Sequence, residues 1–101
     1  MRTIHKYALA IKGEQEIPMP KGATLLSVQE QRSWPILWAE VEDEADLVSR
    51  VIHCYGTGHP LPALLGPYIG TVLQHDIGLV WHFFDHGERA ACEGASPERE
   101  A

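Results

Sequence analysis

The stretch that decides the fold is residues 25–41, which read LLSVQEQRSWPILWAEV. On both sides of a short connection at residues 32–35, apolar and polar side chains alternate, and this is the period of a β-strand rather than a helix. In the first arm Leu26 and Val28 are expected to face one way, and in the second arm Leu37 and every second residue after it face the core. Two such arms with a short connection predict an antiparallel hairpin.

The same alternation, interrupted by turn signals, extends along the chain. Residues 15–20 hold Pro18 and Pro20, which lack a ladder donor, so this segment is expected to be an edge strand. Strands are expected over residues 3–11, 25–31, 36–41, 48–55, 68–74 and 79–85. Single helical turns fit residues 47–49 and 63–66. The pattern predicts a mostly β fold, a small antiparallel β-sandwich or barrel with one or two short helical turns.

Length and composition predict one small globular domain. The chain has 101 residues, 45% hydrophobic and 22% charged. We expect a single β-rich domain over residues 1–86 and an acidic, disordered tail over 87–101, with a short helix over 88–92 as the alternative for its start. No apolar run reaches the ~20 residues that cross a bilayer, and the first residues lack the apolar segment of a signal peptide. These features predict a cytoplasmic protein of the host cell that does not act at a membrane.

The charge of the chain predicts the chemistry of its partner. The net charge is −6, which disfavours direct binding to a nucleic-acid backbone and favours a host protein or ribonucleoprotein complex with a basic surface. Residues 40–46 hold five acids, in a solvated loop or a turn of helix. The candidate aromatic anchors are Trp34, Trp38 and Tyr55. The predicted partner-binding residues are Trp34, Trp38, Glu40, Glu42, Asp43, Glu44 and Asp46.

A glycine-rich loop is the candidate ligand site, and its residues are Tyr55, Gly56, Thr57, Gly58 and His59. Both glycines tolerate a positive φ, which lets successive N–H groups converge on an anion. Pro60 biases His59 toward an extended backbone. The alternative interpretation is a stiff turn that only steers the chain between two strands.

Metal binding and catalysis are not expected. Neighbouring residues of a strand point to opposite faces, so His53 and Cys54 cannot share an ion, and the Cys/His spacing of a zinc site is absent from the sequence. Cys54 with His53 or His59 is the sole candidate for nucleophilic chemistry, and Cys54 is expected to point into the core. Cys92 lies in the polar tail. We therefore expect a protein without a cofactor, a metal or an enzymatic activity.

Two motifs resemble a known family. The stretches Tyr55–Pro60 (YGTGHP) and Tyr68–Thr71 (YIGT) follow residues 26–31 (LSVQEQ) and 37–39 (LWA) in an order that resembles an uncharacterised family of small bacterial and phage proteins. The resemblance covers residues 1–86. That family has no assigned activity, so the resemblance implies a phage or mobile-element origin.

Together these features predict a non-enzymatic phage-type binding protein that inhibits or modulates a host component. An anti-defence role fits, such as inhibition of a CRISPR effector by occupying a basic protein surface. One alternative is an oligomeric protein that sequesters a small nucleotide signal, and another is a virion accessory protein. Outward-facing Ile36, Trp38 and Phe84 leave apolar surface to cover, and this favours a homodimer.

Overall fold

The computed structural model describes residues 1–89 and shows seven β-strands and no helix within that range. The strands are β1 (Arg2–Ala8), β2 (Glu14–Pro20), β3 (Thr24–Gln31), β4 (Trp34–Glu42), β5 (Leu47–Gly56), β6 (Tyr68–Gln74) and β7 (Leu79–Arg89). The predicted β class is confirmed. The predicted helical turns are wrong: residues 47–49 begin β5, and residues 63–66 lie in an irregular loop punctuated by prolines on both sides.

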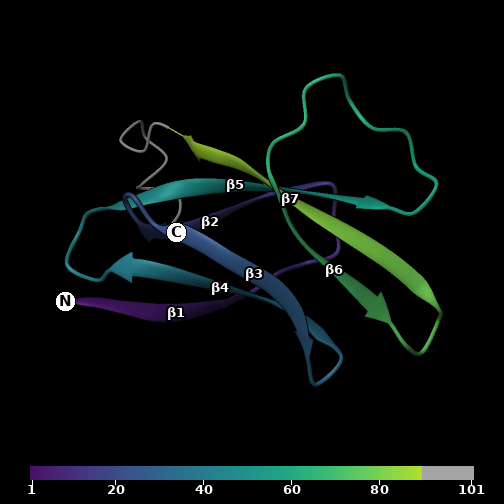
Figure 1. Cartoon of the computed structure of the whole chain (residues 1–101), viewed down its shortest axis with the longest axis horizontal. Coiled ribbons are helices and arrows are strands. Elements are labelled where there is room, and N and C mark those ends of the chain that lie inside the picture. Colours follow the sequence, from purple (N-terminus) through teal and green to yellow (C-terminus); the bar gives the residue numbers. More distant parts are fainter. Residues whose placement is uncertain (90–101) are drawn as a thin grey trace, which may run out of the picture.

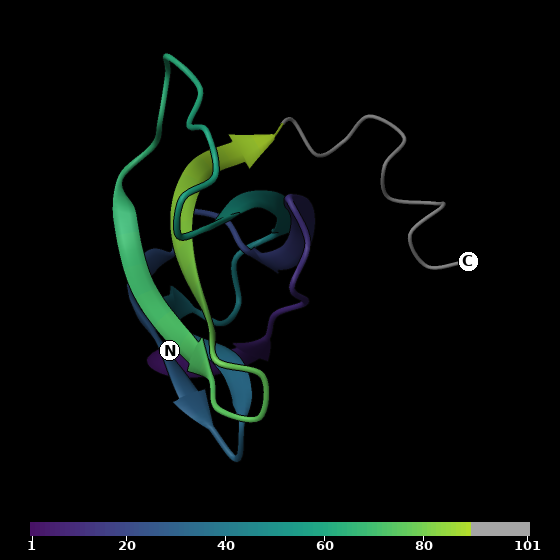
Figure 2. The same ribbon diagram turned by 90° about the vertical axis from the view of Figure 1, so that its right-hand side faces the viewer.

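All seven strands form one sheet in the order β1-β4-β3-β6-β7-β5-β2. Every neighbouring pair is antiparallel except β3 and β6, which run parallel. The sheet is strongly curled into a half-barrel, and the long loop between β5 and β6 projects beyond its body (Figures 1 and 2). The two edges are β1 and β2, so the chain passes directly from one edge to the other. The proline-containing segment is thus an edge strand, as predicted.

The predicted hairpin is present as β3 and β4, with Val28 opposite Leu37. Its two connecting residues, Arg32 and Ser33, have φ of 55° and 67°, and such a two-residue turn matches the twist of the flanking strands. One detail of the prediction is wrong. A bulge between Leu25 and Ser27 leaves Leu26 47% exposed instead of beside buried Val28, because an extra residue reverses the side on which a side chain emerges.

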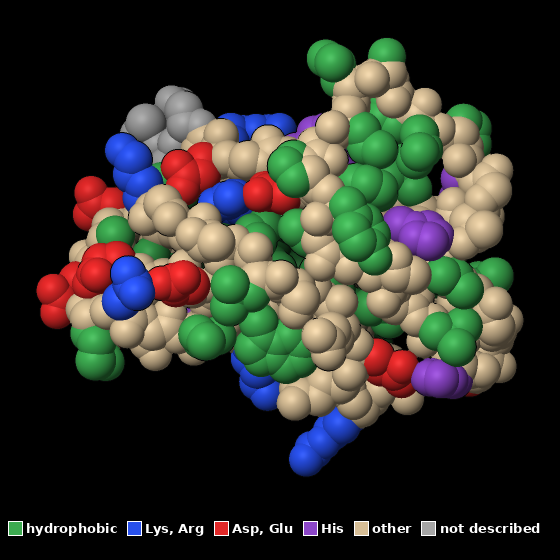
Figure 3. Space-filling model, viewed as in Figure 1, with side chains coloured by type: hydrophobic (Ala, Val, Ile, Leu, Met, Phe, Trp, Pro, Cys, Tyr) green, Lys and Arg blue, Asp and Glu red, His purple; other side chains and the backbone are tan. Residues whose placement is uncertain are grey.

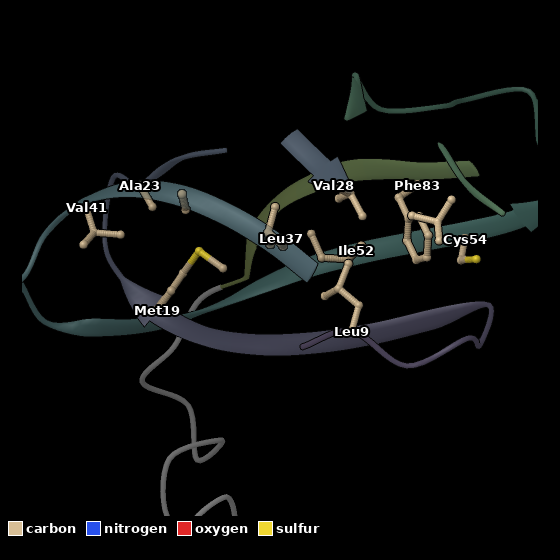
Figure 4. Close-up of a cluster of buried hydrophobic side chains, with 11 residues drawn as sticks. Leu9, Met19, Ala23, Val28, Leu37, Val41, Ile52, Cys54 and Phe83 are labelled. Atoms are coloured by element: carbon tan, nitrogen blue, oxygen red, sulfur yellow. The ribbon is translucent and has the colours of Figure 1, made fainter. Parts of the chain in front are cut away.

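The core lies between the two halves of the curled sheet (Figure 4). It combines inward residues from six strands and the β1–β2 and β2–β3 connections: Leu9, Met19, Ala23, Val28, Leu37, Ala39, Val41, Ile52, Cys54, Val72 and Phe83. Full burial of one large aliphatic or aromatic side chain contributes about 1.5–3 kcal/mol. This cluster therefore supplies the main favourable term for folding, and it fixes which side chains remain on the outer faces.

Strand β7 continues past the predicted domain end at residue 86. Ser49 pairs with Arg89 and Arg50 with Glu88 across the β5–β7 ladder. The Arg50 guanidinium, 12% exposed, binds both oxygens of Asp85 and also contacts Glu88. These contacts hold residues 87–89 in the sheet, so the expected helix does not start at Glu88. Residues 90–101, including Cys92 and most of the predicted tail, lie outside the described residues.

Candidate functional site

The outer face of β1, β4 and β3 gathers most of the predicted partner-binding residues, and we call it the Trp38 face. Even-numbered residues of β4 share this face because side chains alternate along a strand. Across the β1–β4 ladder, Lys6 lies opposite Trp38 and Ile4 lies opposite Glu40. The face comprises Arg2, Ile4, Lys6, Leu26, Trp34, Trp38, Glu40 and Glu42.

An open groove of about 350 Å³ lies on this face, lined by Arg2, Thr3, Ile4, Leu26 and Glu40. Ile4 is 57% exposed and Leu26 47% exposed, while Trp38 is half-buried. Ile36, expected to be outward and uncovered, is on the same side of β4 but buried between Ala8 and Gln29. Ile4 and Leu26 were not among the predicted partner-binding residues. Alternation in β1 could have placed Ile4 outward, but no residue type marks the bulge that exposes Leu26.

The acidic stretch is partly neutralised where it meets β1. The Arg2 guanidinium lies 2.6 Å from a Glu40 oxygen. The Met1 amine donates to Glu42 at 2.5 Å and Asp43 at 2.9 Å, and these hydrogen bonds raise the pKa of the amine. The Glu44 side chain is 84% exposed, and its carboxylate lies 3.9 Å from the same amine. Asp46 is also exposed. The predicted cluster exists, with its most open carboxylates in the turn after β4.

A second cluster lies on the outer face of β5, β7 and β6, around His82. Thr57 Oγ1 lies 2.7 Å from His82 Nε2, and Thr71 Oγ1 lies 3.1 Å from His82 Nδ1. The Tyr68 hydroxyl continues the chain, 2.6 Å from Thr71 Oγ1. The structure thus joins the two sequence motifs, which are separated in the chain, through a histidine that belongs to neither. We call this surface the His82 face, and it comprises Thr57, Tyr68, Thr71 and His82 with the neighbouring rings of Tyr55 and Phe84.

Aromatic rings run beside that chain. The Phe84 ring lies edge-on between the rings of Tyr55 and Tyr68, with centroids 5.9 and 5.8 Å away. Farther along, the rings of His53 and His86 stack at 3.5 Å, and Tyr55 links the two groups through a 3.2 Å hydrogen bond to His53 Nδ1. Tyr68 is the most open of these rings at 59% exposure. In Figure 3 the purple side chains and many green ones lie on the side of β6, whereas most red and blue side chains lie on the opposite side, over the ends of β1, β4 and β5.

The glycine-rich loop adopts the geometry of a stiff turn. The N–H of Gly56 donates to His59 Nδ1 at 3.2 Å, that of Thr57 to the carbonyl of Val80, and that of His59 to the carbonyl of Gly56. The His59 ring folds against Gly56 and the edge of Trp81. An anion bound by the backbone would have to displace these bonds. Gly58 has a φ of 90°, which favours glycine, and a Cβ at Gly56 would lie 2.8 Å from the His59 ring.

The arrangement is poorly suited to nucleophilic chemistry. Cys54 is 5% exposed, and burial raises the pKa of its thiol to about 11, far from a reactive thiolate. Thr57 and His82 resemble a nucleophile and base, but the partner at the other imidazole nitrogen is the Thr71 hydroxyl and not a carboxylate. Within residues 1–89, no group of three potential ligands is placed to hold a metal ion. Nor does that range contain a helix long and apolar enough to span a membrane.

The fold and its surfaces define an all-β protein built on one curled sheet with two dissimilar outer faces. A domain of unknown function, DUF7352, matches residues 1–92, and the chain belongs to this family. The family has no assigned activity. No curated protein and no solved structure matches the chain.

Proposed function

We propose that this chain is a non-enzymatic binding protein that docks through its Trp38 face onto a basic surface of a host protein or ribonucleoprotein complex. From the resemblance to phage proteins we further infer an inhibitory, anti-defence role. The observation that supports docking is the groove with two exposed aliphatic side chains, Ile4 and Leu26, beside half-buried Trp38. Apolar residues at the centre and charges at the rim are the usual anatomy of a protein interface.

The charges around the groove favour a basic partner. Arg2 already pairs with Glu40, and its charge is therefore offset within the chain. Glu44 and Asp46 extend the rim with open carboxylates. Lys6 also lies on this face, but the carboxylates outnumber the cations. Rim charges act mainly on the rate and selectivity of association, while buried apolar anchors set the rate of dissociation. The two parts of the face thus have separable effects on binding.

The test compares a double aspartate variant of the Trp38 face with a single aspartate control elsewhere on the surface. The tagged chain captures its partner from host extract, and the purified partner is then titrated against each variant. Ile4→Asp combined with Leu26→Asp is expected to weaken binding more than about tenfold, because two apolar anchors are lost. Ile77→Asp changes an equally exposed aliphatic residue in the β6–β7 turn and is expected to leave affinity unchanged. Equal effects of both changes, in folded variants, would contradict docking through the Trp38 face.

A further inference from the structure

The hydroxyl and imidazole groups of the His82 face are not used by the proposed docking. We propose that this face binds a nucleotide, with the phosphate at the hydroxyls of the Thr57–His82–Thr71–Tyr68 chain and the base against the Tyr68 ring. Three observations on residues 1–89 contribute to this assignment: the geometry of the hydrogen-bonded groups, the lack of a carboxylate bound to them, and the exposure of the Tyr68 ring. The site lies on the other half of the sheet from the Trp38 face and does not depend on the function proposed there.

The hydrogen-bonded side chains from Thr57 to Tyr68 leave one O–H donor free at one end of the series. A neutral imidazole has one N–H donor and one acceptor nitrogen. If His82 Nε2 carries the proton, it donates to Thr57, Thr71 donates to Nδ1, and the Thr57 hydroxyl proton has no acceptor inside the chain. If Nδ1 carries the proton, every bond reverses and the Tyr68 hydroxyl proton is left over. Either arrangement therefore offers one O–H donor to a ligand.

Protonation of His82 would leave two O–H donors free instead of one. A protonated imidazole donates from both nitrogens, so Thr57 and Thr71 both accept, and Thr71 in turn donates to Tyr68. The hydroxyl protons of Thr57 and Tyr68 are then both available. A ligand rich in acceptors and negatively charged favours that state through its hydrogen bonds and through the imidazolium charge. Phosphate has both properties.

Although the net charge is −6, the described groups that face His82 are hydroxyls and not carboxylates. From β5 and its following turn, Thr57 and Tyr55 face His82; from β6, Thr71 faces it and Tyr68 follows. None of these groups is a carboxylate. Within residues 1–89, no carboxylate is hydrogen-bonded to or paired with a member of the chain. A phosphate at this place meets no bound carboxylate that it would have to displace.

The neighbouring rings supply the second half of the site. Tyr68 is 59% exposed, and its hydroxyl belongs to the chain while its ring extends away toward Phe84. An open tyrosine ring stacks with any nucleobase, and such stacking is sequence-tolerant. A ligand that joins a phosphate to a planar base matches both halves, whereas inorganic phosphate or a nucleoside matches only one.

The experiment is calorimetric titration of the full chain with the four common nucleoside 5′-monophosphates, with inorganic phosphate and with adenosine. At least one nucleotide is expected to bind more tightly than phosphate or adenosine. Thr57→Val should weaken that binding about tenfold through loss of a charged hydrogen bond, and Tyr68→Leu about tenfold through loss of stacking. Tyr68→Phe keeps the ring and should cost less than Tyr68→Leu.

Two controls make the outcome decisive. Thr24→Val changes an exposed threonine of β3 and should leave nucleotide affinity unchanged, as should the Ile4→Asp, Leu26→Asp variant. The proposal is overturned if no nucleotide binds at millimolar concentration, or if binding survives both Thr57→Val and Tyr68→Leu unchanged while these variants remain folded.

Discussion

The Trp38 face and the His82 face belong to one sheet and yet differ in chemistry. The Trp38 face places apolar side chains among paired charges, such as Arg2 with Glu40. The His82 face combines hydroxyl, imidazole and aromatic groups, with Tyr68 and His82 joined through Thr71. An apolar centre with a charged rim suits a macromolecular surface, whereas a few convergent polar groups beside rings suit a small ligand. The contrast is the basis for our two proposals, in which the two halves of the curled sheet bind different classes of partner.

The junction of the two halves, where β3 pairs with β6, should be highly sensitive to an added side chain. Val28 on β3 faces Gly70 on β6 in the one parallel pairing of the described sheet. A side chain at Gly70 would place its Cβ 2.4 Å from the Val28 carbonyl oxygen. We expect Gly70→Ala to destabilise the fold by about 3 kcal/mol in denaturant titration. Gly13→Ala, where the added Cβ meets nothing within 4 Å, is the control. A stable Gly70→Ala variant would show that the junction does not hold the halves together.

The next effect concerns the ion pair beneath the His82 half. Burial raises the pKa of Asp85, but hydrogen bonds from Arg50 and the Gly87 N–H outweigh it and leave the pKa below 3.8. Arg50→Met leaves the Asp85 carboxylate without its ion-pair partner in the sheet. We expect this variant to lose about 2–3 kcal/mol of folding stability at neutral pH.

Acid should remove the difference in stability between the wild type and Arg50→Met. The folded state holds the Asp85 proton less tightly than the unfolded chain does, so the pair stabilises fully above about pH 3.8 and loses its effect as the pH falls below that value. Thermal unfolding of both proteins across this range is the measurement. A difference between the proteins that grows on acidification would contradict the assigned ion pair.

Charge reversal sharpens the functional side of the comparison. The triple change Glu42→Lys, Asp43→Lys and Glu44→Lys should slow association with the basic partner about tenfold and weaken its dependence on salt. Nucleotide binding at the His82 face should not change. Stopped-flow mixing at several salt concentrations measures the rate. An unchanged rate and salt dependence would remove the acidic turn from the docking surface.

The smallest expected effect is the response of the stacked histidines to pH. Burial, and then the neighbouring His86, lower the pKa of His53 below 6.5, partly offset by Glu14. The unfolded chain therefore takes up this proton first, so stability should fall as the pH drops from about 6.5 toward the folded pKa. The loss should disappear in His53→Phe, which has no titrating group at this position. A wild-type stability that rises over this interval would contradict the depressed pKa.

The strands were predictable because their signals are local. Alternation located the β3–β4 hairpin, and Pro18 and Pro20 marked β2 as an edge. The exposure of Leu26 was not predictable, since a bulge depends on the register with β4 rather than on a residue type. The same limit applies to both surfaces. Trp38 was predicted to face outward, but Ile4 lies on the same face only through the pairing of β1 with β4. Likewise, His82 joins the two motifs only because β7 lies between β5 and β6.

The most direct measurement is amide hydrogen exchange of the chain alone and in complex with its captured host partner. Docking through the Trp38 face predicts added protection of amides in β1, β3, β4 and the acidic turn, with exchange in β6 and β7 unchanged. Protection confined to β5, β6 and β7 would contradict it and would place the macromolecular surface on the His82 side of the sheet.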